Sequence, residues 1–380
     1  MQFRWHPAAR IVDAGGKLHE AGAGQGGVLE DRPGALALQA ALGSASFRIG
    51  APDAPAPEPG PQPVFETLSG GTSGTPKRIR RTQASWTASF AVNDRLFGLG
   101  GPAAVLGRLV HSLALYGAVE TLHLGGELHL LEGLRPDRQR AALATRAVQV
   151  LYATPAQLRL LAEAAGPPLP ALRLILVGGS KLDPALRQAL AALTPARVVE
   201  FYGAAEASFI AISDAATPEA SVGRPYPGVE IRATPDGIAL RSPYLAQGYA
   251  GPPGGAVWQD GWLHLDEFVR LEGGFLYPLG RASRMVKVAD QAAYPEEIEA
   301  MMLGLPGITR AAVLPVANPL RGAVLVAVVM GDPGQEPAVL AALRAAFGPL
   351  VAPRALHWRD DWPMLPSGKT DLAALARGLT

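Results

Sequence analysis

The feature that most limits the fold of this chain is an alternation of short apolar runs with longer helical periods, between about residues 103 and 250. The apolar runs include LHLL (128–131), VQVLYA (148–153) and LRLILVGG (172–179). Helical periodicity separates them, and Thr154 stands where the N-cap of one helix is expected. Strands that alternate with helices form a largely parallel sheet covered on both faces. We therefore predict an α/β fold.

The composition changes along the chain and indicates two unequal domains. At 380 residues the chain is long enough for one large domain and one small one. A Pro/Ala-rich stretch at 51–63 predicts an extended linker, and 223–281 is rich in strand patterns with frequent glycine and proline. We expect an N-terminal domain of mostly parallel sheets with a β-rich subdomain (1–281), a hinge (282–284) and a small mobile α+β C-terminal domain (285–380).

Composition also excludes several classes of partner. The formal net charge is +1, whereas nucleic-acid and membrane-surface binding need a concentrated basic field. The chain has no cysteine, which excludes disulfides and thiolate metal sites and is typical of a reducing cytoplasm. The start lacks an apolar signal segment, and the longest apolar runs, such as AVLVAVVM (323–330), are too short to span a bilayer. We expect a cytoplasmic protein with no nucleic-acid or membrane partner.

A glycine-rich loop, SGGTSGTPK at 69–77, predicts a phosphate-binding site. It follows the strand pattern VFETLS and precedes a helix predicted from about Gln83 to Leu96. A P-loop would need lysine directly after glycine and a Ser/Thr next, but Lys77 follows proline and Arg78 occupies the next position. The loop is therefore expected to wrap the β- and γ-phosphates of a nucleotide with backbone N–H groups and hydroxyls.

Lysine is rare in this chain, which makes each lysine a candidate for binding a phosphate or a carboxylate. It occurs only at positions 17, 77, 181, 287 and 369, while 29 of the 34 basic residues are arginine. Lysine offers a compact charge that suits a single phosphate or carboxylate oxygen.

The glycine loop and five later segments resemble, in the same order, the motifs of the adenylate-forming enzymes. These are the acyl-CoA synthetases, non-ribosomal peptide adenylation domains and luciferases, whose loop runs Thr/Ser-Ser/Gly-Gly-Thr/Ser-Thr/Ser-Gly-x-Pro-Lys. The resemblance covers about 65–380. The later segments are EFYGAAEAS (200–208), GRPYPGVEI (223–231), DGWLHLDEFVRLEGGFLYPLGR (260–281), MVKVADQAAYPEEIE (285–299) and LPSGKTDLAAL (365–375).

The resemblance implies a nucleotide site. Tyr202 would flank the adenine, Glu206 would help to hold magnesium with Thr72 as a second candidate, and Asp266 with Arg281 would hold the ribose hydroxyls. The Thr-Gly that precedes the aspartate in relatives is reduced here to one leucine, so Glu267 is an alternative to Asp266. The ATP- and AMP-binding residues expected are Ser69, Gly71, Thr72, Ser73, Gly74, Thr75, Lys77, Tyr202, Gly203, Ala204, Asp266 and Arg281.

The resemblance also implies catalytic residues and an acyl pocket. Lys369 would bridge the carboxylate and the α-phosphate during adenylation, and Lys287 lies at the start of the mobile domain. With Glu206, these two lysines form the expected catalytic set. The expected pocket residues are His111, Ser112, Gly178, Gly179, Ser180 and Lys181.

Two pocket residues keep an alternative reading. His111 would be a gate residue or a hydrogen-bonded core histidine. Lys181 would pair with a second carboxylate or a phenolate of the substrate, or would cap the helix that starts at Pro184 from its exposed side. The stretch 109–118 contains no aspartate to bind an α-ammonium, which disfavours an amino-acid substrate.

Together these residues imply a compact ATP- and Mg²⁺-dependent ligase that activates a small-molecule carboxylic acid and passes it to coenzyme A. A rival hypothesis replaces coenzyme A by the phosphopantetheine arm of an acyl carrier protein, because Asp290 stands where relatives have glycine near the thiol tunnel. Ala205 occupies the position where related enzymes have an alcohol side chain in the tyrosine-glycine motif, which removes one expected contact to the α-phosphate. Only about 68 residues precede the loop, so a homodimer is an open hypothesis for covering the shortened side. A catalytically inactive binding protein is the remaining alternative.

Overall fold

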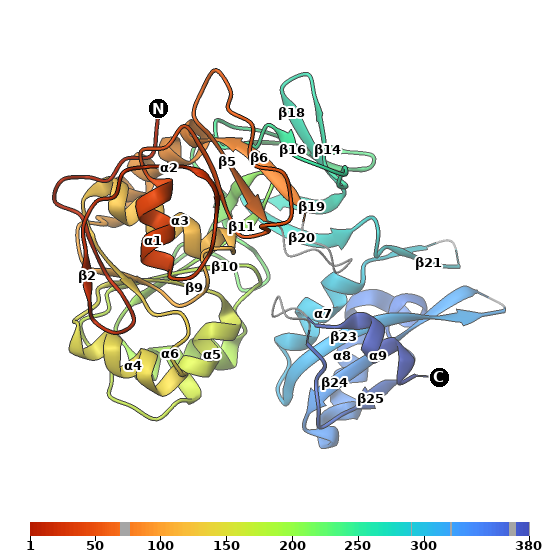
Figure 1. The fold of residues 1–380 in the computed structure, drawn as a ribbon. Helices are drawn as coiled ribbons and strands as arrows, with labels where there is room; N and C mark the ends of the chain where they lie inside the picture. Colours follow the sequence, from red (N-terminus) through yellow and green to blue (C-terminus); the bar gives the residue numbers. More distant parts are fainter. Residues whose placement is uncertain (69–76, 290, 320, 365–369, 380) are drawn as a thin grey trace.

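The computed structural model describes residues 1–68, 77–289, 291–319, 321–364 and 370–379. Its largest element is a nine-stranded sheet with the order β13-β12-β11-β10-β9-β7-β8-β1-β2 (Figure 1). The strands from β11 to β1 run parallel to one another, and β2, β12 and β13 are antiparallel additions at the two edges. The strands are β1 (Arg10–Val12), β2 (Leu18–His19), β7 (Ala103–Val105), β8 (Glu127–Leu130), β9 (Val150–Ala153), β10 (Leu174–Gly178), β11 (Arg197–Ala204), β12 (Ser208–Ile212) and β13 (Arg224–Pro225).

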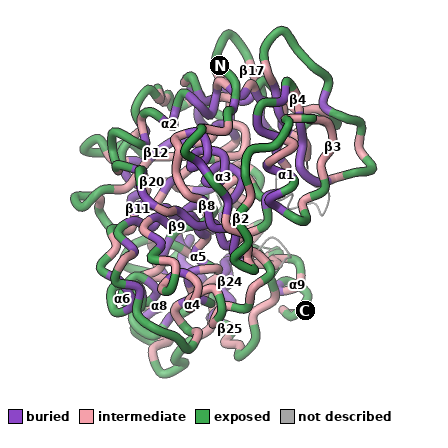
Figure 2. The backbone as a smooth tube through the Cα atoms, turned by 60° about the vertical axis from the view of Figure 1, so that its left-hand side comes forward, coloured by how far each residue is buried: buried purple, intermediate pink, exposed green. Residues whose placement is uncertain are grey.

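Helices cover both faces of this sheet. Side chains alternate along each strand, so Val150 and Tyr152 pack into one hydrophobic core while Leu151 and Ala153 pack into another. Figure 2 shows the buried segments gathered along these central strands. The first core includes α1 (Gly34–Ala41), α2 (Gln83–Phe97) and α3 (Ser112–Leu124); the second includes α4 (Pro136–Thr145), α5 (Pro155–Glu163) and α6 (Pro184–Leu193).

A second sheet carries the strands that flank the glycine-rich loop. Its order is β16-β6-β5-β4-β3, with β5 and β6 antiparallel. The buried Arg48 side chain on β4 binds Glu66 on β5, at 2.6 Å, and also the carbonyl of Pro55 in the segment 51–63, at 2.7 Å. The strands are β3 (Gly27–Leu29), β4 (Ser46–Ile49), β5 (Val64–Leu68), β6 (Arg78–Thr82) and β16 (Gly248–Tyr249).

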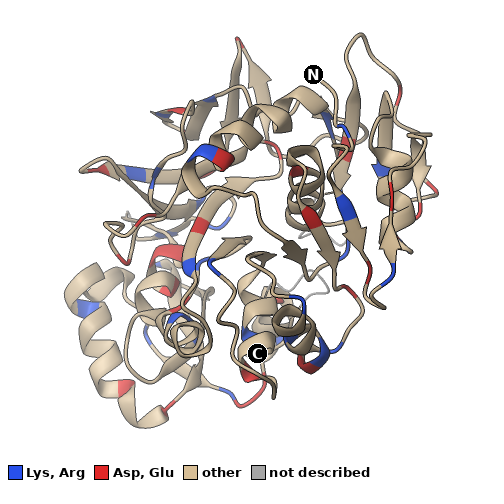
Figure 3. Ribbon diagram, turned by 90° about the vertical axis from the view of Figure 1, so that its left-hand side faces the viewer, with Lys and Arg blue, Asp and Glu red and all other residues tan. Residues whose placement is uncertain are grey.

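Smaller antiparallel units make up the β-rich part of the chain before residue 282. A four-stranded sheet has the order β14-β15-β18-β17, and β19 pairs with β20 as a separate ribbon. Their bounds are β14 (Glu230–Thr234), β15 (Gly237–Arg241), β17 (Val257–Gln259), β18 (Trp262–Leu265), β19 (Glu267–Glu272) and β20 (Phe275–Arg281). Figure 3 shows acidic and basic residues interspersed over the ribbon.

The residues after 285 pack around a hydrophobic core of their own, which includes Ile298, Leu325 and Leu343. Helices lie against a three-stranded sheet of order β23-β24-β25, beside the short ribbon β21-β22. The elements are β21 (Val286–Val288), β22 (Gln291–Ala293), α7 (Pro295–Leu303), β23 (Ile308–Asn318), β24 (Gly322–Gly331), the 3₁₀ turn Pro333–Gln335, α8 (Glu336–Val351), β25 (Leu356–Trp358) and α9 (Leu372–Arg377). The predicted fold class, a large parallel-sheet part followed by a small α+β part, is confirmed.

Local signals placed two helix starts correctly. The Thr82 side chain accepts a hydrogen bond from the backbone N–H of Ser85 at the start of α2. Thr154 forms a capping box with Gln157, in which each side chain binds the other residue's backbone N–H. These bonds satisfy N–H groups that the first helical turn leaves without a partner.

Candidate functional site

The glycine-rich loop connects two paired strands of the second sheet. β5 ends at Leu68 and β6 begins at Arg78, and Leu68 also forms a parallel bridge with His111 at the start of α3. Ser69, Gly71, Thr72, Ser73, Gly74 and Thr75 lie outside the described residues. Lys77 is described, and its ammonium nitrogen lies 5.9 Å from the ring centroid of Tyr249. Leu68 and Lys77 therefore lie beside α3 and β16, respectively.

Tyr249 connects Lys77 to Glu206. Its hydroxyl donates a 2.7 Å hydrogen bond to Oε1 of Glu206, which lies in the turn between β11 and β12. Tyr249 is held by pairing with Ile79 of β6. Burial, followed by the hydrogen bond to the Glu206 carboxylate, raises the pKa of the Tyr249 phenol, so the hydroxyl remains a donor. Lys77, just before β6, and Glu206, just after β11, thus both lie beside the Tyr249 side chain.

A second group of side chains forms around Glu267. The Tyr202 hydroxyl donates a hydrogen bond to Oε2 of this carboxylate, and Arg281 Nη2 donates to Oε1 at 3.2 Å. Glu267 and Arg281 are direct partners in the β19–β20 ribbon. Burial and the negative charge of Glu267 raise the pKa of Tyr202. Asp266 contributes its backbone carbonyl to the N–H of Ala282, at 2.7 Å. Of the two acidic candidates, Glu267 is the one that meets Tyr202 and Arg281.

Gly203 is the residue that allows the turn between these two groups. A Cβ atom built there would lie 2.0 Å from the backbone oxygen of Ser208, which is too close for any side chain. The register between β11 and β12 also shifts between Tyr202 and Gly203. Ala204 pairs with Ser208 and closes the turn that carries Glu206. Glycine is therefore required at position 203 for β11 to approach the backbone of Ser208 so closely.

The predicted acyl-pocket residues lie at the end of β10 and the start of α3. Gly178 ends β10, and a Cβ atom there would lie 3.7 Å from the Leu113 side chain. Gly179 has a φ of 105°, which favours glycine, and Ser180 is exposed. His111 is the N-cap residue of α3 and Ser112 its first residue. Desolvation by neighbouring atoms, then the Arg108 charge, lowers the pKa of His111, which favours the neutral imidazole.

Lys181 is turned away from these residues. Its ammonium nitrogen donates a 2.9 Å hydrogen bond to the backbone oxygen of Ser221. It lines a cavity of about 730 Å³ between α6 and the loop around 213–221. The capping part of the alternative is wrong, because the Asp183 side chain accepts from the N–H of Leu186 and is the cap, whereas the expected exposed position of Lys181 is observed. The chain leaves the sheet after Gly178, so this lysine ends up beside α6.

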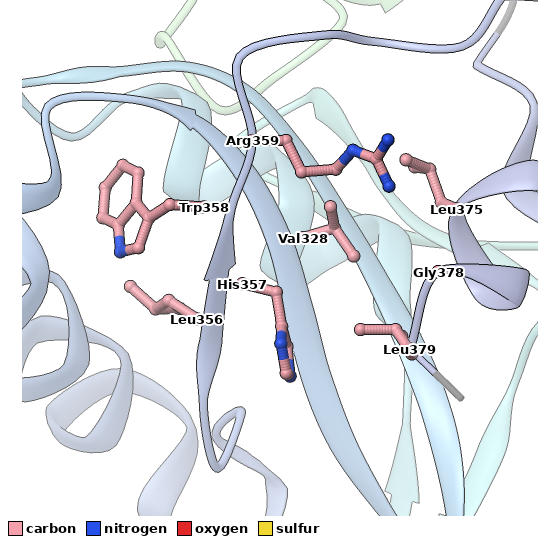
Figure 4. Close-up of a pocket in the computed structure, with 8 residues that line it drawn as sticks. All are labelled: Val328, Leu356, His357, Trp358, Arg359, Leu375, Gly378 and Leu379. Carbon is pink, nitrogen blue, oxygen red and sulfur yellow. The ribbon is translucent and has the colours of Figure 1, made fainter.

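The two other predicted catalytic residues belong to the C-terminal part. Lys287 is exposed on β21, where it pairs with Ala292. Lys369, like Asp290, lies outside the described residues. A cavity of about 430 Å³ in this part lies between β24, β25 and α9, and Figure 4 shows Val328, His357 and Leu375 on its walls. Neither Tyr202 nor Glu206 lines this cavity.

Glu206 is a suitable partner for a nucleotide-bound magnesium ion. Among the described residues, no group of three or more His, Cys, Asp or Glu side chains could hold a metal ion. Magnesium that binds with ATP needs only one or two protein carboxylates, since phosphate oxygens and water occupy its other positions. The half-buried carboxylate of Glu206 could supply one. Thr72, the second candidate, lies outside the described residues.

Sequence reasoning missed two residues of this site. Tyr249 comes after a glycine in a segment without a motif that we recognised. Arg81 lies on the same face of β6 as the buried Ile79, and such an arginine at an apolar strand position was the available signal.

In the part of the chain that the structure describes, no helix is long and apolar enough to cross a membrane.

Comparison with known proteins gives two family matches. Residues 11–249 match the model of the AMP-binding enzymes, and residues 297–369 match that of the AMP-binding enzyme C-terminal domain. An uncharacterized acyl-CoA ligase of Bacillus subtilis, YhfT, is 30% identical over 324 residues, which cover 81% of this chain and 67% of the relative. A salicylyl-CoA synthase / salicylate adenylyltransferase of Streptomyces is 30% identical over 349 residues, which cover 83% of this chain and 63% of that protein.

Solved structures show the same fold. The amide bond synthetase McbA from Marinactinospora thermotolerans superimposes with a TM-score of 0.73 at 24% identity, over 93% of this chain and 79% of that one. The chain spans about two thirds of the length of the curated relatives it matches.

Proposed function

The chain belongs to the family of AMP-binding enzymes, and on that premise we propose that it activates a carboxylic acid with ATP and transfers the acyl group to a thiol. In the first step a carboxylate oxygen attacks the α-phosphorus, the bond to the β-phosphate breaks and pyrophosphate leaves. In the second step a thiol sulfur attacks the acyl carbon, AMP leaves and the thiol loses its proton. The proposed thiol is that of coenzyme A.

One observation carries this proposal. Tyr202 on β11 and Glu206 in the turn that follows this strand each meet a partner from a distant segment, Glu267 and Tyr249 respectively. An aromatic ring and a carboxylate beside Arg281 suit an adenosine, and a carboxylate near Lys77 suits a metal-bound phosphate chain. The arrangement therefore supports a nucleotide lying across the end of β11.

Each residue has a task in this proposal. Glu267 accepts the ribose hydroxyls, with Arg281 beside it, and Tyr202 lies along the adenine. Glu206 holds magnesium, which when bound neutralises charge on the phosphates. Lys77 places the departing pyrophosphate. Lys369 donates to the carboxylate and the α-phosphate as negative charge develops there.

We place the acyl group between Gly178 and the start of α3. The absence of a side chain at Gly178 leaves room beside Leu113, and we place the neutral His111, the N-cap residue of α3, at the mouth of this space. The apolar and aromatic surroundings in the first core suit an uncharged acyl chain or ring.

We place the bend between the two domains at Ala282–Ser283. Within the predicted hinge, Arg284 binds Glu299 of α7 at 2.6 Å and the carbonyl of Val313 at 3.0 Å. Arg284 would therefore move with the C-terminal domain, and a rotation that brings Lys287 toward the acyl-adenylate would start before it.

A second candidate acceptor is the phosphopantetheine arm of an acyl carrier protein. The observation that favours it is Asp290, an acidic residue where related enzymes have glycine beside the thiol path. A similar protein of Streptomyces coeruleorubidus, 28% identical over 347 residues, is named a fatty acid–[acyl-carrier-protein] ligase, so this acceptor is represented among the relatives.

The proposal is tested by pyrophosphate release with ATP and Mg²⁺ over aliphatic, aryl and dicarboxylic acids, each with and without coenzyme A. Repeated turnover only with coenzyme A supports the ligase and identifies its acid. A single burst that coenzyme A does not extend favours a carrier protein. Protein that binds Mg·ATP but releases no pyrophosphate with any acid contradicts the proposed activity.

A further inference from the structure

Arg81 is an arginine in a position where a strand usually places an apolar side chain. Only 1% of it is exposed, and it shares the inward face of β6 with Ile79. Burial lowers the pKa of its guanidinium to about 9, and the nearby negative charge of Glu206 opposes this shift. The group is therefore a buried cation at neutral pH. A buried charge is costly and needs compensating bonds, so its partners indicate what it does.

Besides a longer 3.4 Å bond from Nη1 to the hydroxyl of nearby Ser85, Arg81 has partners in two segments far away in the sequence. Nη1 donates a 2.7 Å hydrogen bond to the backbone oxygen of Tyr244, and Nη2 donates a 2.9 Å bond to the backbone oxygen of Ala205. Ala205 precedes Glu206 directly. Arg81 itself lies four residues after Lys77. One side chain thus connects the strand that follows the glycine-rich loop to the turn that carries the acidic residue.

The segment that starts at Tyr244 completes the connection. The N–H of Ala246 binds the backbone oxygen of Glu206 at 2.8 Å, and the N–H of Gln247 binds that of Arg80 at 2.8 Å. Tyr249 then donates its hydroxyl to the Glu206 carboxylate. The Arg81 side chain binds both segments that meet here, through the backbone oxygens of Tyr244 and Ala205.

We propose that Arg81 is a positioning residue that holds the Glu206 turn at a set separation from Lys77 and so organises the binding of Mg·ATP. This inference rests on the proposed function. Binding a metal-bound triphosphate needs a carboxylate and an ammonium at a separation matched to the ligand, and misplacement by about 1 Å can cost up to about 10²-fold in rate. In this proposal Arg81 does not bind magnesium or ATP itself. It positions Glu206 through its hydrogen bond to the backbone oxygen of Ala205.

The test compares Arg81→Met with Arg80→Met. Both remove a guanidinium from neighbouring positions of β6, but the Arg80 side chain lies on the other face and its backbone bond to Gln247 is kept. Calorimetric titration with Mg·ATP, without any acid, measures binding alone. We expect Kd to rise at least tenfold in Arg81→Met, with a matching rise in the Mg²⁺ concentration needed for half-maximal pyrophosphate release. Arg80→Met should stay within about twofold of the unchanged protein.

Arg81→Lys covers the case in which the methionine variant does not fold. Lysine keeps the buried charge but cannot bind two carbonyls with one planar group. We expect it to fold and to weaken Mg·ATP binding about as much as Arg81→Met. A folded variant of either kind with unchanged Mg·ATP affinity overturns the inference. If the unchanged protein binds Mg·ATP but activates no acid, the proposed activity fails while the role of Arg81 is still measured by binding.

Discussion

The Tyr202 hydroxyl and the Glu267 carboxylate are joined by a hydrogen bond across 65 residues of sequence. The same carboxylate accepts from Arg281 at 3.2 Å. Asp266, its neighbour, accepts the N–H of Ala282 with its backbone carbonyl, and its negative charge contributes to the raised pKa of Tyr249. The two acidic residues therefore differ in what they can do for a nucleotide, although they are adjacent in the chain.

Glu267→Gln is expected to raise the KM for ATP about tenfold or more, because a neutral amide accepts the ribose hydroxyls more weakly than a carboxylate. Asp266→Asn removes the same charge one position earlier and is expected to change this KM less than threefold. Steady-state pyrophosphate release over a range of ATP concentrations measures both. The opposite order of effects would assign the ribose to Asp266.

Lys369→Ala is expected to slow adenylation by about 10²-fold or more, by analogy with the loss of one preorganised donor to a developing charge. Acid-dependent exchange of pyrophosphate into ATP isolates this half-reaction. Lys17→Ala serves as the control, because Lys17 is an exposed lysine outside every motif. Equal exchange rates in the two variants would remove Lys369 from the mechanism.

Lys181→Ala is expected to leave the preference among acids unchanged. The ammonium group binds the Ser221 carbonyl and lies beside α6, so its loss should affect local stability more than substrate choice. The ratio of kcat/KM for a monocarboxylic and a dicarboxylic acid tests this. A shift of that ratio by tenfold would restore Lys181 to the acyl pocket.

Glu120→Gln is expected to flatten the pH dependence of stability. Burial raises the pKa of this carboxyl from 4.5 to about 7, and hydrogen bonds from Tyr152, Asn93 and Tyr116 only partly oppose this. The folded protein then holds a proton that the unfolded chain has released, so this contribution to stability is full below about pH 4.5 and is lost as the pH rises through 7.

The loss is on the order of 3 kcal/mol, since each unit of pKa corresponds to about 1.4 kcal/mol. Thermal unfolding at pH 5, 6, 7 and 8 measures it as the difference in Tm between Glu120→Gln and the unchanged protein. That difference should move in favour of the variant as the pH rises. A difference that does not vary with pH would show that Glu120 does not titrate in this range.

The sequence by itself determined the elements and their order. Alternating apolar and helical periods predicted the parallel sheet, and Thr154 marked the start of α5 through a bond to a residue only three positions away. The order of the motifs identified the family. Such signals are local, because strand alternation and helix caps depend on neighbours within a few residues.

Only the tertiary structure decided which distant side chains meet. A bulge in the β19–β20 ribbon between Phe268 and Val269 influences which acidic residue faces Arg281, and counting back along the chain led to Asp266 instead. The direction of Lys181 and the bonds of Arg81 likewise follow from how whole segments pack. A shift of one residue in a strand turns a side chain to the opposite face, so contacts across a sheet depend on a register that composition and spacing do not carry.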